Sequence, residues 1–398
     1  MTKNWNQLYT LSKELTKPAS VDNIFSNEDV NYLQQELKNV INKFLDRGEL
    51  HKGIKIYINQ ELNNAKVYEM VENRPEKDKT IEDWCNQLFG NDKFGVVFNS
   101  LEAYSNDLTE KMCNIVAPLL EKAGLPLGGL SFLFFMGNYG FTPFGIHKEA
   151  KGEEGFLFHL GPNNKDFYTW DIEEYNKIEH NTQVFHDIEK FLPQSKKYPL
   201  KAKSVMFIPH HVYHIANTNE FSLSVVMDYI NPSRDYLENK MAGQIAETNS
   251  IEKNQGYLAP IKSDVSLDWN FLLNKTTWEE KYKKELNKFI TKLKSNAGVL
   301  QSSLIKNNAL PNPPFNIRAK TIFPILLNDQ ESESCIIARG HELKIKKNIS
   351  IEEVLKKLNN GETISFQELE TSFSPDWDLG YVFQFVNELL MVEAINIV

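Results

Sequence analysis

Hydrophobic residues recur at helical spacing in the first part of the chain. Between Val30 and Leu45 an apolar residue returns every third or fourth position, which predicts an amphipathic helix. Ser26 and Asp29 have the spacing of a capping box that would begin it. Residues 53–59 alternate instead, which predicts a half-buried strand. The same patterns predict helices over 80–89 and 105–122 and a strand over 94–98.

From Leu130 to Pro232 the pattern changes to short apolar runs divided by glycine and proline. Residues 131–136 are almost wholly apolar, as in a strand that is covered on both faces. Residues 171–200 are polar and are interpreted as an insertion between strands. Closely spaced short strands with Gly and Pro turns favour a barrel or jelly roll. Further strands are predicted around His147 and over 155–160, 167–170, 204–209 and 222–229.

The pattern after Pro232 is helical again, and the chain ends in an apolar, strand-like segment over 394–398. Helices predicted over 350–358, 365–373 and 377–391, followed by that segment, have the outline of a winged helix. We therefore predict an α+β protein with a double-stranded β-helix (jelly-roll) core and flanking helices. The predicted domains are a catalytic domain with N-terminal helices over 1–232, a helical segment over 233–310 and a winged-helix-like domain over 311–398.

Composition narrows the classes of protein that fit. The net charge of -9 argues against a general binder of nucleic acid or acidic membranes. Cys85, Cys113 and Cys335 lie far apart, so we expect no disulfide framework and no CxxC metal site. That cysteine usage fits a reducing compartment. No apolar run reaches membrane-spanning length and the first residues lack an apolar segment, so we expect a cytoplasmic protein without membrane partners.

Two histidines and a glutamate make the candidate metal site. Alternate side chains of a strand share a face, so His147 and Glu149 point the same way. His214 follows a hydrophobic strand that ends at Pro209. Two imidazoles and one carboxylate hold a divalent metal on one face and leave the opposite positions open. We predict His147, Glu149 and His214 as metal ligands, and a polar residue at a strand end remains the alternative for His147.

The other histidines receive different interpretations. His210 and His211 lie in the turn after a predicted strand and are expected at the entrance of the barrel. His159 lies on a strand, and we interpret it as a core histidine with satisfied hydrogen bonds. His180 and His186 fall in the polar insertion and are expected to be exposed.

Lys165 is the second candidate site residue. An ammonium inside a barrel is costly unless it is paired, and a dicarboxylate cosubstrate would supply the pair. One carboxylate would bind the metal and the other Lys165, with a hydroxyl of Ser224 or Ser222 beside it. The alternative is a turn lysine that faces water after Pro162.

These residues resemble the JmjC branch of the cupin superfamily, the iron(II)- and 2-oxoglutarate-dependent oxygenases. The family usually shows Gly-Asp before the penultimate strand, where this chain has Lys203-Ser204. The matching pieces are residues 144–149, Lys165 before an aromatic strand, residues 204–209 and residues 212–217. The resemblance implies His147, Glu149 and His214 as the catalytic Fe(II) ligands and Lys165, assisted by Ser224, as the 2-oxoglutarate-binding residue.

The order of barrel, helices and winged-helix-like end resembles the ribosomal oxygenases, which hydroxylate ribosomal proteins and dimerise through their helical segment. The resemblance implies hydroxylation of a peptide or protein side chain with conversion of 2-oxoglutarate to succinate and CO2, and a homodimer. Glu149 alone does not decide between hydroxylation and demethylation. Residues 301–398 carry 9 Lys/Arg against 13 Asp/Glu, so we expect this end to dock protein rather than nucleic acid.

Two other functions remain open at this point. A cupin that binds metal without oxygenase activity, such as an isomerase, would not need Lys165 for oxoglutarate. A hydroxylase of a free small molecule would need it. We also expect an apolar pocket lining from Phe134, Phe156, Phe158 and Tyr168, and packing in the core is the equal alternative for these residues.

Overall fold

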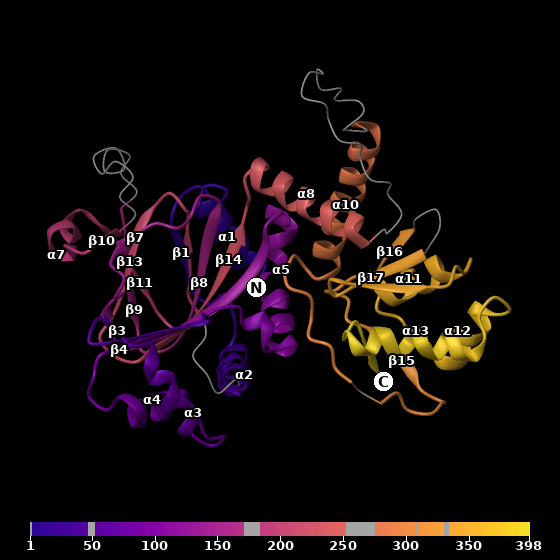
Figure 1. Cartoon of the computed structure of the whole chain (residues 1–398). Coiled ribbons are helices and arrows are strands. Elements are labelled where there is room, and N and C mark those ends of the chain that lie inside the picture. Colours follow the sequence, from indigo (N-terminus) through magenta and orange to yellow (C-terminus); the bar gives the residue numbers. More distant parts are fainter. Residues whose placement is uncertain (1, 47–51, 171–183, 252–274, 308, 330–333) are drawn as a thin grey trace.

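The computed structural model describes residues 2–46, 52–170, 184–251, 275–307, 309–329 and 334–398 (Figure 1). Two antiparallel sheets and their helices form the first part of the chain, and a mixed α/β unit forms the last part. The larger sheet has the order β1-β12-β8-β14-β5-β4-β2-β3. Its strands are β1 (Ala19–Val21), β2 (Ile54–Ile58), β3 (Glu61–Leu62), β4 (Phe94–Phe98), β5 (Gly129–Gly137), β8 (Glu153–Pro162), β12 (Val205–Ile208) and β14 (Ser222–Ile230).

The second sheet has the order β10-β7-β13-β9-β11, and the short strand β6 pairs with β13 at one end. Its strands are β6 (Gly140–Phe141), β7 (Ile146–His147), β9 (Lys165–Trp170), β10 (Val184–Phe185), β11 (Lys196–Leu200) and β13 (Tyr213–Thr218). Side chains from both sheets meet in a cluster that includes Leu157 of β8, Phe167 of β9 and Ile208 of β12. The inner faces of the sheets therefore enclose a common interior.

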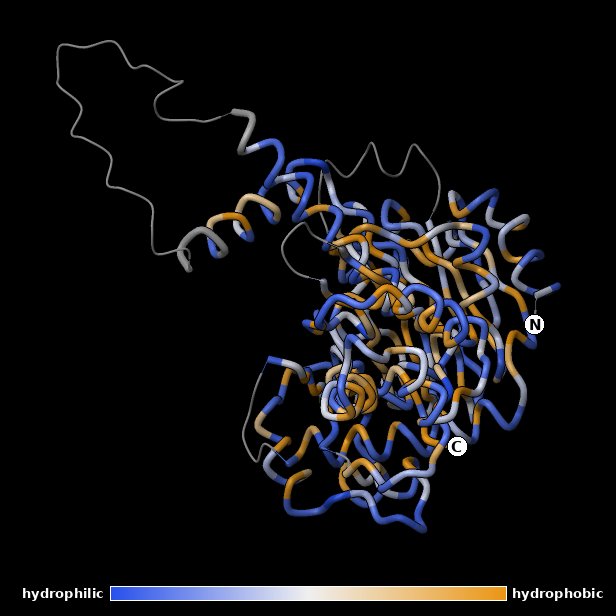
Figure 2. The backbone as a smooth tube through the Cα atoms, turned by 90° about the vertical axis from the view of Figure 1, so that its right-hand side faces the viewer, coloured by the Kyte–Doolittle hydropathy of each residue, from blue (hydrophilic) through white to orange (hydrophobic). Residues whose placement is uncertain are grey.

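Helices cover the outer face of the larger sheet, and their apolar sides join its outward side chains in one large core (Figures 1 and 2). The predicted capping box is confirmed: the Asp29 amide donates to Ser26 Oγ at 3.1 Å, and the Ser26 amide donates to the Asp29 carboxylate at 2.7 Å. The helices are α1 (Thr2–Leu11), α2 (Asn27–Leu45), α3 (Val67–Glu72), α4 (Ile81–Phe89) and α5 (Asn106–Ala123), with the 3-10 turns η1 (Asn64–Lys66) and η2 (Leu101–Ala103).

The polar stretch before Ser204 is not simply an insertion. Residues 171–183 lie outside the described ranges, as does the prediction for His180. The rest of the stretch contains β10, the helix α7 (Ile188–Phe191), the 3-10 turn η3 (Leu192–Gln194) and β11, which pairs with β9 along its whole length. The prediction was wrong for these residues because β11 is an edge strand, and its exposed Lys196 and Lys197 hide the alternation of Tyr198 and Leu200.

The C-terminal part of the chain has a hydrophobic core of its own, which includes Ile317 and Leu389. The helices α8 (Arg234–Ile251) and α10 (Lys275–Ser295) pack on each other, while residues 252–274 of the predicted helical segment lie outside the described ranges. The three predicted C-terminal helices and the terminal strand are confirmed, whereas the sheet β16-β17-β18 was not predicted. These elements are β15 (Asn316–Ala319), β16 (Leu326–Asp329), β17 (Ser334–Ala338), β18 (His341–Ile345), α11 (Ile351–Asn359), β19 (Thr363–Ser365), α12 (Phe366–Phe373), α13 (Leu379–Met391) and β20 (Ile395–Ile397).

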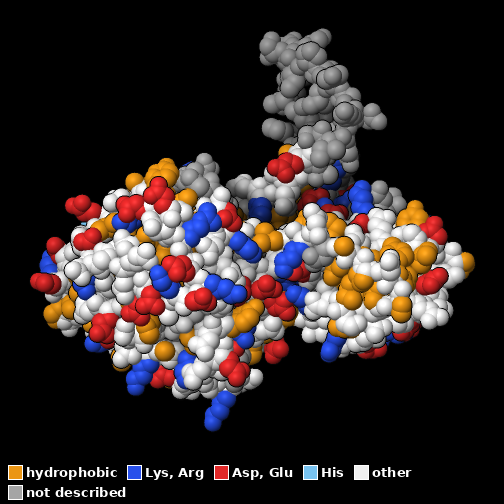
Figure 3. All heavy atoms as spheres, turned by 90° about the horizontal axis from the view of Figure 1, so that it is seen from below, with side chains coloured by type: hydrophobic (Ala, Val, Ile, Leu, Met, Phe, Trp, Pro, Cys, Tyr) orange, Lys and Arg blue, Asp and Glu red, His pale blue; other side chains and the backbone are white. Residues whose placement is uncertain are grey.

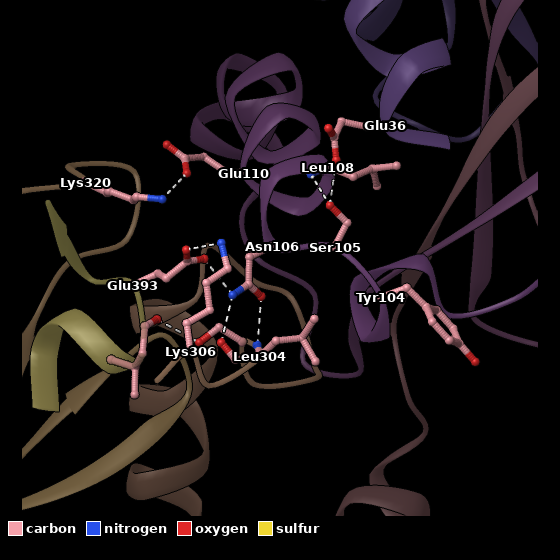
Figure 4. Close-up of polar contacts among 12 residues, drawn as sticks. Glu36, Tyr104, Ser105, Asn106, Leu108, Glu110, Leu304, Lys306, Lys320 and Glu393 are labelled. Atoms are coloured by element: carbon pink, nitrogen blue, oxygen red, sulfur yellow. Dashed lines mark hydrogen bonds and ion pairs between the residues drawn. The ribbon is translucent and has the colours of Figure 1, made fainter. Parts of the chain in front are cut away.

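A buried polar junction ties this second unit to α5 (Figure 4). Asn106, at the start of α5, donates to Leu304 O at 2.8 Å and to the Glu393 carboxylate at 2.6 Å. Its own Oδ1 accepts the Leu304 amide at 2.8 Å. Lys306 pairs with the same Glu393, so one amide side chain and one carboxylate connect three segments that are remote in sequence.

The described ranges contain no helix that is both long and apolar enough to span a bilayer. Cys85, Cys113 and Cys335 are buried and free.

Replacing Asn106 by Ala should lower the free energy of unfolding by about 1–3 kcal/mol, because the amide and carbonyl of Leu304 and one oxygen of Glu393 lose the hydrogen bonds that Asn106 supplies, while Glu393 keeps only its ion pair with Lys306. Urea unfolding measures the change. Asn114→Ala is the matched control, since Asn114 lies on the same helix and its exposed amide donates only to a carbonyl of its own helix. Equal effects of the two substitutions would contradict the junction's role.

Candidate metal centre

Strand pairing brings the two predicted histidine ligands together. β7 and β13 are antiparallel, and His147 lies directly opposite His214 in their register. β7 is held from the other side by β10, which pairs His147 with Val184. Gly145, just before β7, has φ +83, and a Cβ there would lie 2.5 Å from the carbonyl oxygen of Phe185. Only glycine allows this close approach of the backbones.

The three predicted ligands converge on one point. Glu149 Oε1 lies 3.4 Å from His214 Nε2 and 3.8 Å from His147 Nε2. One ligand atom from each of the three residues lies within 4.8 Å of the others. Glu149 follows β7 rather than belonging to it, but its side chain still shares the face of His147. Structure thus places together the residues that the sequence singled out.

Backbone carbonyls fix the orientation of both imidazoles. His147 Nδ1 lies 3.0 Å from Gly145 O, and His214 Nδ1 lies 3.1 Å from Val212 O. A carbonyl can only accept, so each Nδ1 carries the hydrogen and each Nε2 presents a lone pair to the centre. This is how ligating histidines are usually held.

Charge and burial keep two of the three donors, His147 and Glu149, deprotonated at neutral pH. Burial, followed by the neighbouring His214, lowers the pKa of His147 to about 4. Burial raises the pKa of Glu149, but its hydrogen bond to His214 and the nearby imidazoles outweigh that effect and bring the pKa to about 2. The His147 imidazole and the Glu149 carboxylate are therefore deprotonated at neutral pH, and together with His214 Nε2 they make a donor set that fits a divalent metal ion.

The triad lies in a cavity of about 460 Å³ between the two sheets. Its apolar wall comes from inward side chains, among them Leu133 and Phe135 of β5, Leu157 of β8, Phe167 of β9 and Val226 of β14. The predicted lining by Phe134, Phe156, Phe158 and Tyr168 is wrong. The first three lie in the core under the helices, and Tyr168 packs on the outer side of the second sheet. Successive strand residues face opposite ways, so the prediction missed by one position.

Lys165 reaches the same cavity from β9 and is 1% exposed. Its Nζ donates to Ser224 Oγ at 2.9 Å and lies 5.8 Å and 5.7 Å from the ring centroids of Phe135 and Tyr139. The alternative of a turn lysine in water is therefore wrong. Burial lowers the pKa of Lys165 to about 7, and no carboxylate pairs with it within the described ranges. Ser222, the other serine considered, has a buried hydroxyl without a hydrogen-bond partner among the described residues.

The remaining histidines lie away from the centre. His159 is fully buried and hydrogen-bonded at both ring nitrogens, which confirms the core interpretation. His210 binds Glu154 at 2.8 Å. Neither His210 nor His211 lines the cavity, so their predicted place at its entrance is wrong. His186 is exposed, as predicted.

Two acidic residues of the cavity were missed in the sequence. Asp228 of β14 and Glu153 of β8 line its wall with Asn99 and Lys55. Burial, then the charges of Glu149 and Glu153, raises the pKa of Asp228 to about 7. The spacing of Asp228 from Ser224 could have identified it in the sequence, because residues 224, 226 and 228 of one strand share a face.

Comparison with known proteins gives a fold but no sequence relative. No family model matches the chain, and neither does any curated protein. The fold is similar to a crystal structure of YcfD from Escherichia coli, with 10% identity, a TM-score of 0.53 and coverage of 99% of this chain and 98% of that chain. YcfD described as a ribosomal oxygenase in complex with cobalt and 2-oxoglutarate matches with 9% identity, a TM-score of 0.54 and the same coverage. At such identities the likeness establishes a shared fold over the whole length.

Substituting either His214 or Glu149 by Ala should weaken Co(II) binding by more than about 100-fold, because loss of an outer partner alone costs about 10–100-fold. Titration followed by cobalt absorbance measures the affinity. His210→Ala is the control, since that ring faces Glu154 instead of the triad. Unchanged cobalt affinity in the His214 and Glu149 variants would place the metal elsewhere.

Proposed function

We propose that this protein is an iron(II)- and 2-oxoglutarate-dependent oxygenase that hydroxylates a side chain of a peptide or protein. One observation carries the proposal. A three-residue metal-binding face and a buried lysine without a carboxylate partner in the described chain share one cavity. We infer that the two sheets correspond to the double-stranded β-helix of JmjC-type cupins and that the C-terminal unit corresponds to a winged helix.

The residues of the chain divide the work between them. His147, Glu149 and His214 would hold iron(II), which supplies oxygen activation coupled to oxidative decarboxylation of 2-oxoglutarate to succinate and CO2. The cavity beside these three residues would leave room for cosubstrate and oxygen. Lys165 would bind the far carboxylate of 2-oxoglutarate with a charge-assisted hydrogen bond. The apolar wall around Phe135 and Leu157 excludes water from the reacting groups.

A protein substrate is supported by the likeness to a structure described as a ribosomal oxygenase and by the surface charge. Acidic and basic side chains intermingle on the face seen in Figure 3 instead of forming a basic field. Phosphate binding favours a basic patch, so this surface suits a protein partner better than a nucleic acid. The proposed setting is the cytoplasm, where iron(II) and thiols stay reduced.

A homodimer through the α8–α10 pair is part of the proposal. Tyr236 is 55% exposed and Trp278 is 41% exposed on these two helices, next to the cluster formed by Met241 and Phe289. Sedimentation velocity would show a dimer if these aromatic residues are covered by a second copy, and a monomer would remove this part of the proposal.

Lys165→Ala should raise the KM for 2-oxoglutarate by about 30-fold or more, because losing one partner of a buried charge pair costs about 2 kcal/mol or more. Succinate formation measures turnover, and mass spectrometry of co-expressed ribosomal proteins tests for the added oxygen atom. Lys197→Ala is the control, since that exposed lysine pairs with Asp166 outside the cavity. A metal-binding cupin without oxygenase activity would bind cobalt normally and form no succinate with any tested protein.

Oxoglutarate affinity should depend on pH through Lys165. In the free protein its pKa is lowered to about 7, and binding requires the charged ammonium. Affinity should therefore stay level below about pH 7 and fall about tenfold for each further pH unit. Calorimetry on the cobalt-loaded protein between about pH 6 and about pH 9 measures the affinity for 2-oxoglutarate. Lys165→Arg keeps its charge over this range, so its profile should fall less steeply and keep only the contribution of other cavity groups such as Asp228, whose pKa is raised to about 7. A flat profile in the unsubstituted protein would show that Lys165 does not carry the charge that binds.

A further inference from the structure

A fully buried histidine lies behind the lysine and takes no part in the metal triad. His159 of β8 is 0% exposed and is paired with Ser224 of β14 in the sheet. The register shifts at this point: Leu223 pairs with Gly161, while Ser224 pairs with His159, so β8 holds one extra residue. Such a bulge re-aims the side chains around it. Here it sets the His159 ring against the hydroxyl that contacts Lys165.

The hydrogen-bond partners of His159 determine its tautomer. Nε2 lies 2.7 Å from the carbonyl oxygen of Asn163, which can only accept, so Nε2 carries the hydrogen. Nδ1 lies 3.2 Å from Ser224 Oγ. Burial, then the charge of Lys165, lowers the pKa of His159 to about 3 although the backbone oxygens of Asn163 and Leu223 act in the opposite direction, so the ring is neutral. Nδ1 of the neutral ring is an acceptor, and Ser224 must donate to it.

This tautomer decides what Ser224 can do. A serine hydroxyl has a single hydrogen, and His159 Nδ1 takes it. Ser224 Oγ is then left as an acceptor, and Lys165 Nζ donates to it at 2.9 Å. Ser224 therefore has no hydrogen to offer a carboxylate in the cavity and acts through the lysine. Of the three ammonium hydrogens, one is fixed on Ser224 and two remain for a ligand.

Asn163, at the end of this series of hydrogen bonds remote from Lys165, is also held in place. Asn163 lies in the turn between β8 and β9, and its side chain donates to Phe221 O at 3.0 Å. The direction of donation runs from His159 to Asn163, from Ser224 to His159 and from Lys165 to Ser224. Every member except the ammonium has its hydrogen committed. A buried network of this kind holds one geometry because each alternative leaves a polar group unpaired.

We propose that His159 is a positioning residue for cosubstrate binding, which fixes the Ser224 hydroxyl as an acceptor and so aims the Lys165 ammonium at the far carboxylate of 2-oxoglutarate. This inference rests on the proposed function. It assigns a role to a side chain that touches neither the metal ligands nor the cavity. Substituting His159 should therefore change the affinity for 2-oxoglutarate and leave the affinity for the metal unchanged.

Replacing His159 by Asn or by Gln should remove one of the two hydrogen bonds of the ring and keep the other. In His159→Asn the amide oxygen can take the place of Nδ1 and accept from Ser224, while the bond to Asn163 is lost. In His159→Gln the longer amide can keep the donor to Asn163, while the acceptor for Ser224 is lost. Both residues are polar and smaller than or similar to histidine, so neither overpacks the core.

Calorimetric binding of 2-oxoglutarate to the cobalt-loaded protein tests the proposal. His159→Gln should weaken binding about fivefold, the worth of one net hydrogen bond, and His159→Asn should stay within about twofold. Cobalt affinity should be unchanged in both. Ser224→Ala should weaken 2-oxoglutarate binding, and adding His159→Gln to it should cost nothing more, because the two residues act through one contact. His210→Ala controls for loss of a histidine outside the network.

Long-range proton–nitrogen NMR of the unsubstituted protein gives a readout that is independent of binding. It should show His159 neutral with its hydrogen on Nε2. A charged ring, a hydrogen on Nδ1, or full oxoglutarate affinity in His159→Gln would overturn the inference. If Lys165→Ala weakens binding and His159→Gln does not, the proposed function stands and only this inference falls. If the unsubstituted protein binds cobalt and no 2-oxoglutarate, both fall together.

Discussion

The register between β7 and β13 is the constraint on which the rest of the site depends. It places His147 directly opposite His214, so a slip of one residue would turn one imidazole out of the interior. Several features hold it. β10 pairs with β7 on its far side, Gly145 permits the close backbone approach, and carbonyls at Gly145 and Val212 set the ring orientations. The arrangement of the candidate metal ligands is thus a consequence of sheet pairing and glycine placement.

Burying polar and charged groups in the interior costs free energy unless each of them has a partner. The three candidate metal ligands and the Lys165 ammonium share a partly apolar cavity, and burial shifts the pKa of His147 down to about 4 and that of Lys165 down to about 7. Each buried polar group needs a partner. The histidines find theirs in backbone carbonyls, and Lys165 finds one hydroxyl and two aromatic faces. What the lysine lacks within the described chain is an anion, and a dicarboxylate bound to the metal would provide it.

Sequence patterns among near neighbours predicted the candidate site residues better than they predicted the arrangement of the strands. The alternation of His147 and Glu149, the capping box at Ser26 and the punctuated apolar runs all depend on near neighbours. The wrong pocket lining by Phe156 and Phe158 has another cause. Which face of a strand meets the helices is set by distant segments, and both faces of β8 are buried. The edge strand β11 was missed because its exposed lysines mask its alternation, and β17 was missed because it is buried at every position and shows no alternation.

The central claim is that His147, Glu149, His214 and Lys165 form one site for iron(II) and 2-oxoglutarate. Anaerobic titration of the metal-free protein with iron(II) and then 2-oxoglutarate tests it most directly, by following the visible charge-transfer absorption of a chelated keto acid. The account predicts a band that appears only when both are present and saturates at a single equivalent of each. Iron binding with no band at saturating 2-oxoglutarate would contradict it and leave a metal-binding protein without the proposed cosubstrate.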